Sequence, residues 1–384
     1  GRIVAVGDAK TLARAHGDAE LTDLGPSVIL PGLVNAHTHL ELSGCNAGDW
    51  PGGSFGDWIL SLPRRIGRQS DRPAEEIFAK AVNKGIKQCV RFGATAIGDI
   101  SQQMQVSRTI LRDAPIRSVS FGEVIGLAGN RTRYLELLPR AIDRSLENNR
   151  MRIGLTPHAP YTVDLPGYRE CLDLGRSHRL PLATHLAETP AEREFLENHQ
   201  GEFRQIWETL GHWQDGVETF RGSPVRFAHA IGLLDYESTL LAHVNYCDDE
   251  ELEILARGQA SVVYCPRTHR YFGHPPHRWR EMLDRGINVV VGTDSCASSP
   301  DLNLVDDLRL MHEIGPDFPV DQLWRMATLR AATALGWETE IGSLEPGKSA
   351  DFVAFEVDSD QPLTEILESY RLPAAVWAAG RRLT

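Results

Sequence analysis

The chain has 384 residues, of which 42% are hydrophobic and 24% charged, and its formal net charge is -12. This length allows one large barrel or two or three smaller domains, and the acidic balance without a basic stripe argues against nucleic acid or an anionic membrane as a partner. No run is long enough to cross a bilayer, and the first residues lack the apolar core of a signal peptide. We therefore expect a soluble protein that binds a small molecule.

The six cysteines are scattered along the chain without any CxxC pair. This spacing suggests neither a zinc finger nor a disulfide framework. We interpret the cysteines as reduced thiols in a cytoplasmic protein. The sequence leaves homo-oligomerisation open.

Eight short apolar runs alternate with longer helix-like stretches, which is the pattern of a parallel β/α fold. Helical spacing of apolar residues is clear in 74–93 and 248–259. Eight such units predict an α/β fold of the (β/α)8 TIM type, with the barrel over residues 32–337. The expected strands are 32–39, 94–100, 116–124, 152–159, 180–188, 240–245, 260–265 and 287–294.

The two ends of the chain resemble each other in composition. Residues 1–10 and 27–32, near the start, and 341–357 and 374–383, near the end, combine apolar strand-like runs with Gly and Pro turns. We expect them to be antiparallel strands, the first opening the chain. Residues 1–31 and 338–384 are therefore predicted to form a small β-sandwich domain together.

The first barrel strand ends in His-Thr-His, at His37 and His39. Alternate strand residues face the same way, so both imidazoles can reach one metal ion at the barrel mouth. Taken alone, the pair could be two polar residues at a strand end. His185 ends the fifth strand and Asp294 the eighth, and a core histidine and a helix-capping aspartate are the competing interpretations of these two. Together the four residues predict an open catalytic site for zinc, with ferrous iron as the alternative.

The fourth strand carries His158 and no lysine. A carbamylated lysine or an acid that could bridge two metals therefore has no candidate there. We predict one divalent metal ion.

These motifs carry a family resemblance that runs from about Pro31 to Phe355. The segments PGLVNAHTHLELS, PHAPYTV, THLAE, LLAHVNYCDDEEL and GTDSCASSPDLNLVDDLRLM resemble, in order, the amidohydrolase superfamily, in its branch of nucleobase and nucleoside aminohydrolases. NAHTHLELS, GSFGDWI, SFGEVIG and CPRTHRYFG are most similar to the aminodeoxyfutalosine deaminases of menaquinone biosynthesis. The resemblance implies a hydrolase acting on C–N bonds other than peptide bonds, in cyclic amidines.

The resemblance also implies roles for the polar residues. Metal hydroxide would attack a ring carbon that bears an amino group, Glu188 would shuttle the proton to the ring nitrogen, and ammonia would leave. Asp294 would orient and deprotonate the water, and His243 would stabilise the developing charge. His229 is a rival for His243, and a solvated loop acid is the alternative interpretation of Glu188.

Five residues are candidates for substrate contact. His158 could instead be a hydrogen-bonded loop histidine, and Trp58 could close the first loop rather than stack on a ring. Glu123 could bind ribose hydroxyls or a ring N–H. Arg267 could bind a carboxylate bidentately, although structural ion pairs are the commoner fate of such residues. Ser298 follows the last barrel strand.

Two other functions compete with deamination of an aminodeoxyfutalosine-like ring. The same scaffold supports guanine, pterin and adenosylhomocysteine deaminases and triazine chlorohydrolases; Glu188 favours deamination, because leaving ammonia needs a proton and leaving halide does not. A metal-free, barrel-shaped binding protein is the remote alternative, and the intact set of metal-site residues argues against it.

Overall fold

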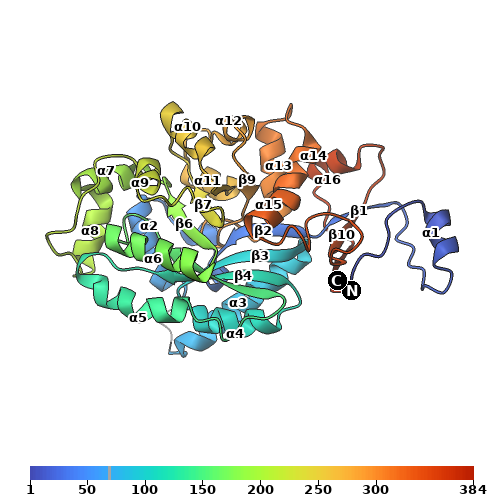
Figure 1. Ribbon diagram of the computed structural model, residues 1–384, viewed down its shortest axis with the longest axis horizontal. Helices are drawn as coiled ribbons and strands as arrows, with labels where there is room; N and C mark the ends of the chain where they lie inside the picture. The colour runs from blue at the N-terminus through green and yellow to red at the C-terminus, as the bar shows by residue number, and fades with distance from the viewer. Residues whose placement is uncertain (68–70) are drawn as a thin grey trace.

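The computed structural model describes residues 1–67 and 71–384, and its centre is a barrel of eight parallel strands (Figure 1). All eight predicted strands are present, and each pairs with its neighbour in chain order. The barrel strands are β2 (Leu33–Thr38), β3 (Ala94–Ser101), β4 (Arg117–Val124), β5 (Met151–Pro157), β6 (Leu182–Leu186), β7 (Thr239–His243), β8 (Ser261–Tyr264) and β9 (Val289–Val291).

The first and last strands meet where the predicted metal ligands lie. Thr38 and Asp294 form a parallel bridge, and the Asp294 amide donates to the His37 carbonyl oxygen at 3.0 Å. Thr38 turns away from the mouth and donates to the Gly98 carbonyl oxygen. Closure of the barrel therefore brings residues more than 250 positions apart in sequence into contact.

Helices surround the barrel, and the two amphipathic stretches predicted as helices form α3 and α10. Helix α10 begins at a capping box, because the Asp248 carboxylate accepts from the Glu251 amide and the Glu251 carboxylate accepts from the Asp248 amide. The helices are α1 (Ala9–Ala15), α2 (Phe55–Arg65), α3 (Ala74–Arg91), α4 (Met104–Asp113), α5 (Arg131–Ala141), α6 (Leu165–His178), α7 (Pro190–Asn198), α8 (Gly201–Thr209), α9 (Pro224–Ala230), α10 (Asp249–Arg257), α11 (Pro266–Phe272), α12 (Trp279–Asp284), α13 (Leu304–Ile314), α14 (Val320–Met326), α15 (Leu329–Ala334) and α16 (Pro362–Glu368).

The two ends of the chain form a separate antiparallel sheet, in the order β1, β10, β11, β12. Its strands are β1 (Ser27–Pro31), β10 (Phe352–Glu356), β11 (Ala375–Ala378) and β12 (Arg381–Arg382). The sequence predicted a sandwich, but this part of the described chain has one four-stranded sheet. The predicted strand over residues 1–10 is wrong for most of its length, because the pairing ends at Ile3: Arg2 forms an isolated bridge with Ser349, and the Ile3 amide donates to the Lys348 carbonyl oxygen.

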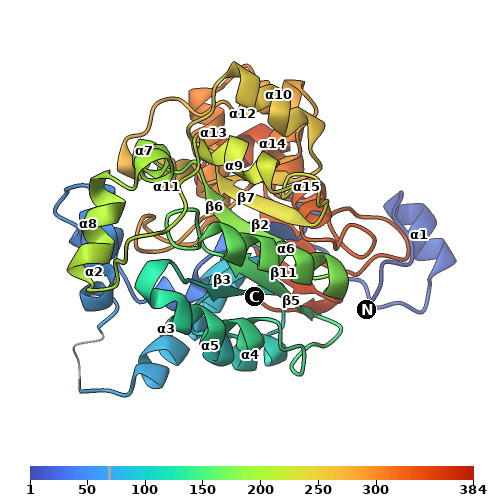
Figure 2. The ribbon, with the colours of Figure 1, turned by 60° about the vertical axis from the view of Figure 1, so that its left-hand side comes forward.

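The segment around α1 stands away from the body of the molecule (Figures 1 and 2). Helix α1 has no buried residue, so burial of apolar surface does not hold it against the rest of the chain. The chain ends lie close together, and the N-terminal amine donates to the Ala379 carbonyl oxygen.

Helices α2 and α8 lie side by side at one edge of the barrel (Figures 1 and 2). The Gly56 amide donates to a Glu202 carboxylate oxygen at 2.7 Å, which ties the start of α2 to α8. Within the described residues, no helix combines the length and the apolar character needed to span a bilayer.

Candidate active site

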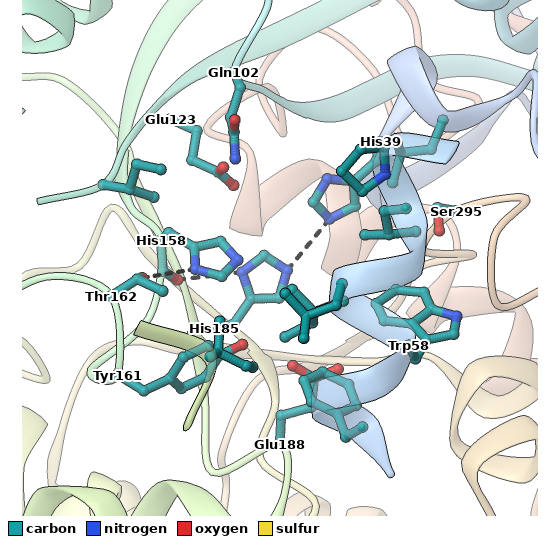
Figure 3. Close-up of a pocket in the computed structure, with 18 of the residues that line it drawn as sticks. His39, Trp58, Gln102, Glu123, His158, Tyr161, Thr162, His185, Glu188 and Ser295 are labelled. Atoms are coloured by element: carbon teal, nitrogen blue, oxygen red, sulfur yellow. Dashed lines mark hydrogen bonds between the residues drawn. The ribbon is translucent and has the colours of Figure 1, made fainter. Parts of the chain in front are cut away.

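A cavity of about 410 Å³ opens at the carboxyl ends of the barrel strands, and most of the predicted site residues line it. Figure 3 shows the His39 and His185 rings facing each other in this cavity, with Glu123 and Glu188 on opposite sides of them. In a TIM barrel this end of the strands carries the chemistry. The predicted residues that line the cavity are His39, Trp58, Glu123, His158, His185, Glu188, His243 and Asp294.

Three imidazoles come together at the cavity, which His39 and His185 line. His37 and His39 extend from β2 and His185 from β6, and one nitrogen of each lies within 4.8 Å of the others. The His39 and His185 Nε2 atoms are 3.3 Å apart. His37 Nε2 is buried and has no hydrogen-bond partner among the described residues. A buried nitrogen in this state needs a partner, because desolvation without one is costly.

Asp294 adds a carboxylate to the three imidazoles. Its Oδ1 atom lies 3.7 Å from His37 Nε2 and 3.6 Å from His39 Nε2. The Asp294 backbone is left-handed, with φ of 56°, which turns the chain sharply just after β9. Strained backbone of this kind is often found at functional sites.

This donor set fits a divalent metal ion. Burial, which is the largest cause, lowers the pKa of His37 and of His185 well below the usual value, so both imidazoles are neutral at pH 7 and offer lone pairs. Three nitrogens and one carboxylate oxygen are the ligands of an open zinc site and also suit ferrous iron.

Ser298 lies behind the carboxylate and away from the cavity. Its hydroxyl donates to Asp294 Oδ2 at 3.0 Å, and its side chain is buried. Ser298, which was expected to contact substrate, does not line the cavity. The serine instead holds the second oxygen of Asp294, so that Oδ1 faces the histidines.

Glu188 and His243 meet beside the imidazole group. Glu188 Oε1 lies 3.4 Å from His243 Nε2, and both side chains are buried. Burial, with a smaller contribution from Asp294, raises the pKa of Glu188 well above its usual value. The rival histidine, His229, is exposed on α9 and does not line this cavity.

Two residues that the sequence did not single out hold the Glu188 turn. The Glu188 amide donates to Glu192 Oε2 at 2.9 Å, and Asn245 Nδ2 donates to the Glu188 carbonyl oxygen at 3.1 Å. Glu192 is fully buried, and burial raises its pKa to about 8. A glutamate four residues after HLAE, at the start of a helix, was the signal that could have identified it.

The three other predicted substrate contacts reach the cavity. His158 Nδ1 lies 2.7 Å from the Thr162 hydroxyl, and Glu123 is buried at the end of β4. The Trp58 indole N–H points out of the cavity and donates to the Ala297 carbonyl oxygen at 3.3 Å, while its ring stacks on Phe55. The hydrogen bond to Ala297 is the loop-closing contact that was the alternative interpretation of Trp58. The Trp58 ring also lines the cavity.

The sequence analysis missed most of the apolar cavity wall. Helices α2 and α8 supply it, together with Tyr161, whose ring stacks on Phe203 at 3.7 Å. Gln102 also lines the cavity, near Glu123 (Figure 3). The apolar face of an amphipathic helix has the same sequence pattern whether it packs against the core or lines a ligand cavity, so the pattern alone could not identify this wall. The wall residues from the two helices are Phe55, Trp58, Ile59, Leu60, Leu62, Pro63, Phe203, Ile206 and Trp207.

The prediction that Arg267 binds a substrate carboxylate is not supported. Arg267 does not line the cavity, and its guanidinium donates to Asp307 Oδ2 at 3.0 Å and to Asp301 Oδ1 at 2.7 Å. Its Nη2 group donates to the backbone carbonyl oxygens of Asp301 and Asn303. The structural ion pair, which was the alternative interpretation, is what the structure contains.

Replacing Arg267 by methionine should destabilise the protein by about 3–5 kcal/mol, because the fully buried Asp307 carboxylate loses its partner. Thermal and denaturant unfolding measure the loss. Arg270→Met is the matched control, since Arg270 is on the same helix but pairs with an exposed glutamate, and its stability should change little. Equal stability of the two variants would contradict the structural role.

The barrel and its cluster of histidines and acids at the strand ends define a metal-dependent hydrolase fold. The model of the Amidohydrolase family matches residues 28–383, and the chain belongs to this family. It is a hydrolase that acts on carbon–nitrogen bonds.

The chain is similar to two curated deaminases that are named for different substrates. A 5-methylthioadenosine/S-adenosylhomocysteine deaminase of Syntrophobacter fumaroxidans is 30% identical over 373 residues, covering 93% of this chain and 78% of the relative. An aminodeoxyfutalosine deaminase of Nitratiruptor is 25% identical over 376 residues, covering 96% of this chain and 88% of the relative. The family resemblance seen in the motifs is therefore confirmed.

The fold is also shared with a solved structure. Helicobacter pylori aminofutalosine deaminase, in complex with methylthio-coformycin, superposes with a TM-score of 0.85 at 24% identity. The match covers all of this chain and 93% of the other.

Proposed function

We propose that the protein is a deaminase of an amino-substituted purine nucleoside, which it converts to the oxo compound and ammonia. One observation carries the proposal: a buried glutamate and a buried histidine, Glu188 and His243, meet 3.4 Å apart in the cavity that His39, His185 and Asp294 also line. Deamination needs a site that can both deliver water to a ring carbon and return a proton to the ring. This cavity holds groups for both tasks.

We assign His37, His39, His185 and Asp294 as the ligands of one divalent ion, zinc in the first instance. When bound, such an ion supplies hydroxide at neutral pH by lowering the pKa of a coordinated water to about 7. The three imidazoles and the carboxylate oriented by Ser298 are the contribution of this chain.

Glu188 is the proton carrier in this proposal. Its burial raises its pKa, so the carboxylate readily takes a proton from the attacking water and passes it to the adjacent ring nitrogen. Asp294 orients the same water. His243, whose pKa burial lowers to about 4, stays neutral and stabilises charge on the attacked centre by a fixed hydrogen bond.

The substrate side of the cavity suits a nucleoside. Glu123 can accept hydrogen bonds from two sugar hydroxyls, His158 can bind the ring edge, and the aromatic and aliphatic wall of α2 and α8 can pack against apolar parts of the ligand. The relatives named above act on adenosine-like compounds. Aminodeoxyfutalosine is the finer proposal, supported by the Nitratiruptor and Helicobacter pylori deaminases, while the Syntrophobacter relative supports 5-methylthioadenosine or S-adenosylhomocysteine.

Ammonia release from the zinc-loaded protein tests the proposal. We expect turnover of at least one adenosine-type nucleoside among aminodeoxyfutalosine, 5-methylthioadenosine, S-adenosylhomocysteine and adenosine, and much slower release from guanine and pterins. Aminodeoxyfutalosine as the best substrate would support the finer assignment, and another adenosine-type nucleoside would overturn only that part. Halide release from a chlorotriazine without ammonia release from any nucleoside, with metal present, would contradict deamination.

A further inference from the structure

His243 is held in a conformation that non-glycine residues rarely adopt. It ends β7 with φ of 74°, and the next residue, Val244, has φ of 51°. Two consecutive left-handed residues persist only where neighbouring groups hold them. The contacts around this turn therefore decide where the His243 imidazole points.

The turn is fastened to the neighbouring strand end by its backbone. The Val244 amide donates to the Leu186 carbonyl oxygen at 2.9 Å, and the Tyr246 amide donates to the Ala187 carbonyl oxygen at 3.1 Å. These bonds fix the turn relative to the Glu188 loop. They leave the His243 carbonyl oxygen to be satisfied from another direction.

His277 satisfies that carbonyl oxygen. It lies in the loop between α11 and α12, and its Nε2 atom is 2.8 Å from the His243 oxygen. A carbonyl oxygen can only accept, so Nε2 carries the hydrogen. Burial lowers the pKa of His277 to about 3, so the ring is neutral at pH 7 and its Nδ1 atom carries no proton.

The His277 ring is itself held in place. It is 9% exposed, and it stacks on Tyr264, the last residue of β8, with centroids 4.1 Å apart and planes 20° apart. Its Nδ1 atom has no hydrogen-bond partner among the described residues. A histidine buried with one nitrogen unused makes a single directed hydrogen bond, and that bond goes to the His243 backbone.

We propose that His277 is a positioning residue, which holds the left-handed turn at His243 through a hydrogen bond to its carbonyl oxygen and so aims the His243 imidazole at Glu188 and the reacting ring. The proposal rests on the function proposed above. Outer residues that orient groups of a catalytic site commonly change activity 10- to 100-fold when they are replaced.

His277→Leu should lower kcat for ammonia release by about 10- to 100-fold with a small change in KM, because the substrate still binds but meets a misplaced imidazole. His277→Gln should recover most of the loss, since its Nε2 can donate from a similar position. His274→Gln is the matched control in the same loop: its Nδ1 contacts the Tyr246 hydroxyl, and kcat should stay within about threefold of the wild type. Metal content and thermal midpoint are measured for every variant.

A readout without substrate separates this proposal from the function on which it rests. In the wild type labelled with ¹⁵N-histidine, the His277 Nε2–H should give a slowly exchanging imidazole signal that His277→Leu removes and His274→Gln retains. Wild-type kcat in a folded His277→Leu variant, or absence of that signal, would overturn the positioning role. Absence of ammonia release from wild-type protein would instead overturn the deaminase assignment. If His277→Leu does not fold, the wild-type signal and the His277→Gln kinetics still decide the matter.

Discussion

Glu188→Gln should lower kcat for ammonia release by about 10²- to 10⁴-fold while one metal ion per chain stays bound, since this is the usual contribution of a positioned acid or base. The amide keeps the size of the side chain and a contact to His243, whose Nε2 lies 3.4 Å from Glu188 Oε1. It cannot carry a proton between the water and the ring. Steady-state kinetics with elemental analysis of the same sample measures both halves of the prediction.

Glu194→Gln provides the control for this experiment. Glu194 is exposed on α7, six residues after Glu188, and its replacement should leave kcat close to that of the wild type. Full deaminase activity in Glu188→Gln, with metal bound, would show that another group carries the proton. Loss of both metal and activity would instead mean that Glu188 helps to hold the ion.

His39→Leu should reduce bound zinc to a small fraction of one ion per chain and lower ammonia release by at least about 10²-fold. The leucine removes a nitrogen that lies 3.3 Å from His185 Nε2 and 3.6 Å from Asp294 Oδ1. Because His39 lines the cavity and is partly exposed, the change costs the core little. Elemental analysis and the zinc dissociation constant give a result that does not depend on turnover.

His229→Asn is the control for metal loss, since His229 is the exposed histidine of α9. It should keep both metal and activity. Full zinc occupancy in His39→Leu, in protein with a native circular dichroism spectrum, would remove His39 from the ligand set and leave the remaining histidines to be tested in its place.

The barrel was predictable because strand and helix periodicity are local. A run of apolar residues indicates that its own segment is buried. In a parallel sheet that is covered on both faces, each strand is apolar along nearly its whole length. The eight expected strands are all present, and the two stretches that were predicted as amphipathic helices form α3 and α10. The boundaries at residues 31/32 and 337/338 between barrel and terminal sheet stay a prediction.

The terminal part was predicted less well. Apolar residues near the start of the chain look like a strand, but a strand also needs a partner edge, and the segment finds only one bridge there. Pairing is a property of two segments, so the composition of one cannot decide it. The same reason explains why the sequence predicted a sandwich where the structure has one four-stranded sheet: composition does not decide which segments pair.

The sequence by itself determined the fold class, the family and the set of polar residues at the strand ends, because strand period and motif spacing are written in neighbouring positions. Only the tertiary structure decided which of those residues share a cavity. Arg267 and Ser298 look like ligand contacts in sequence, yet one is held by two aspartates and the other by Asp294. Glu192 and His277 look incidental, yet each meets a backbone group of a cavity residue. The partners of Arg267 and His277 lie 34 to 40 positions away in sequence, where loop packing sets the contact and local pattern does not show it. Ser298 and Glu192 lie four positions from their partners, and there the turn after the strand decides which group each side chain meets.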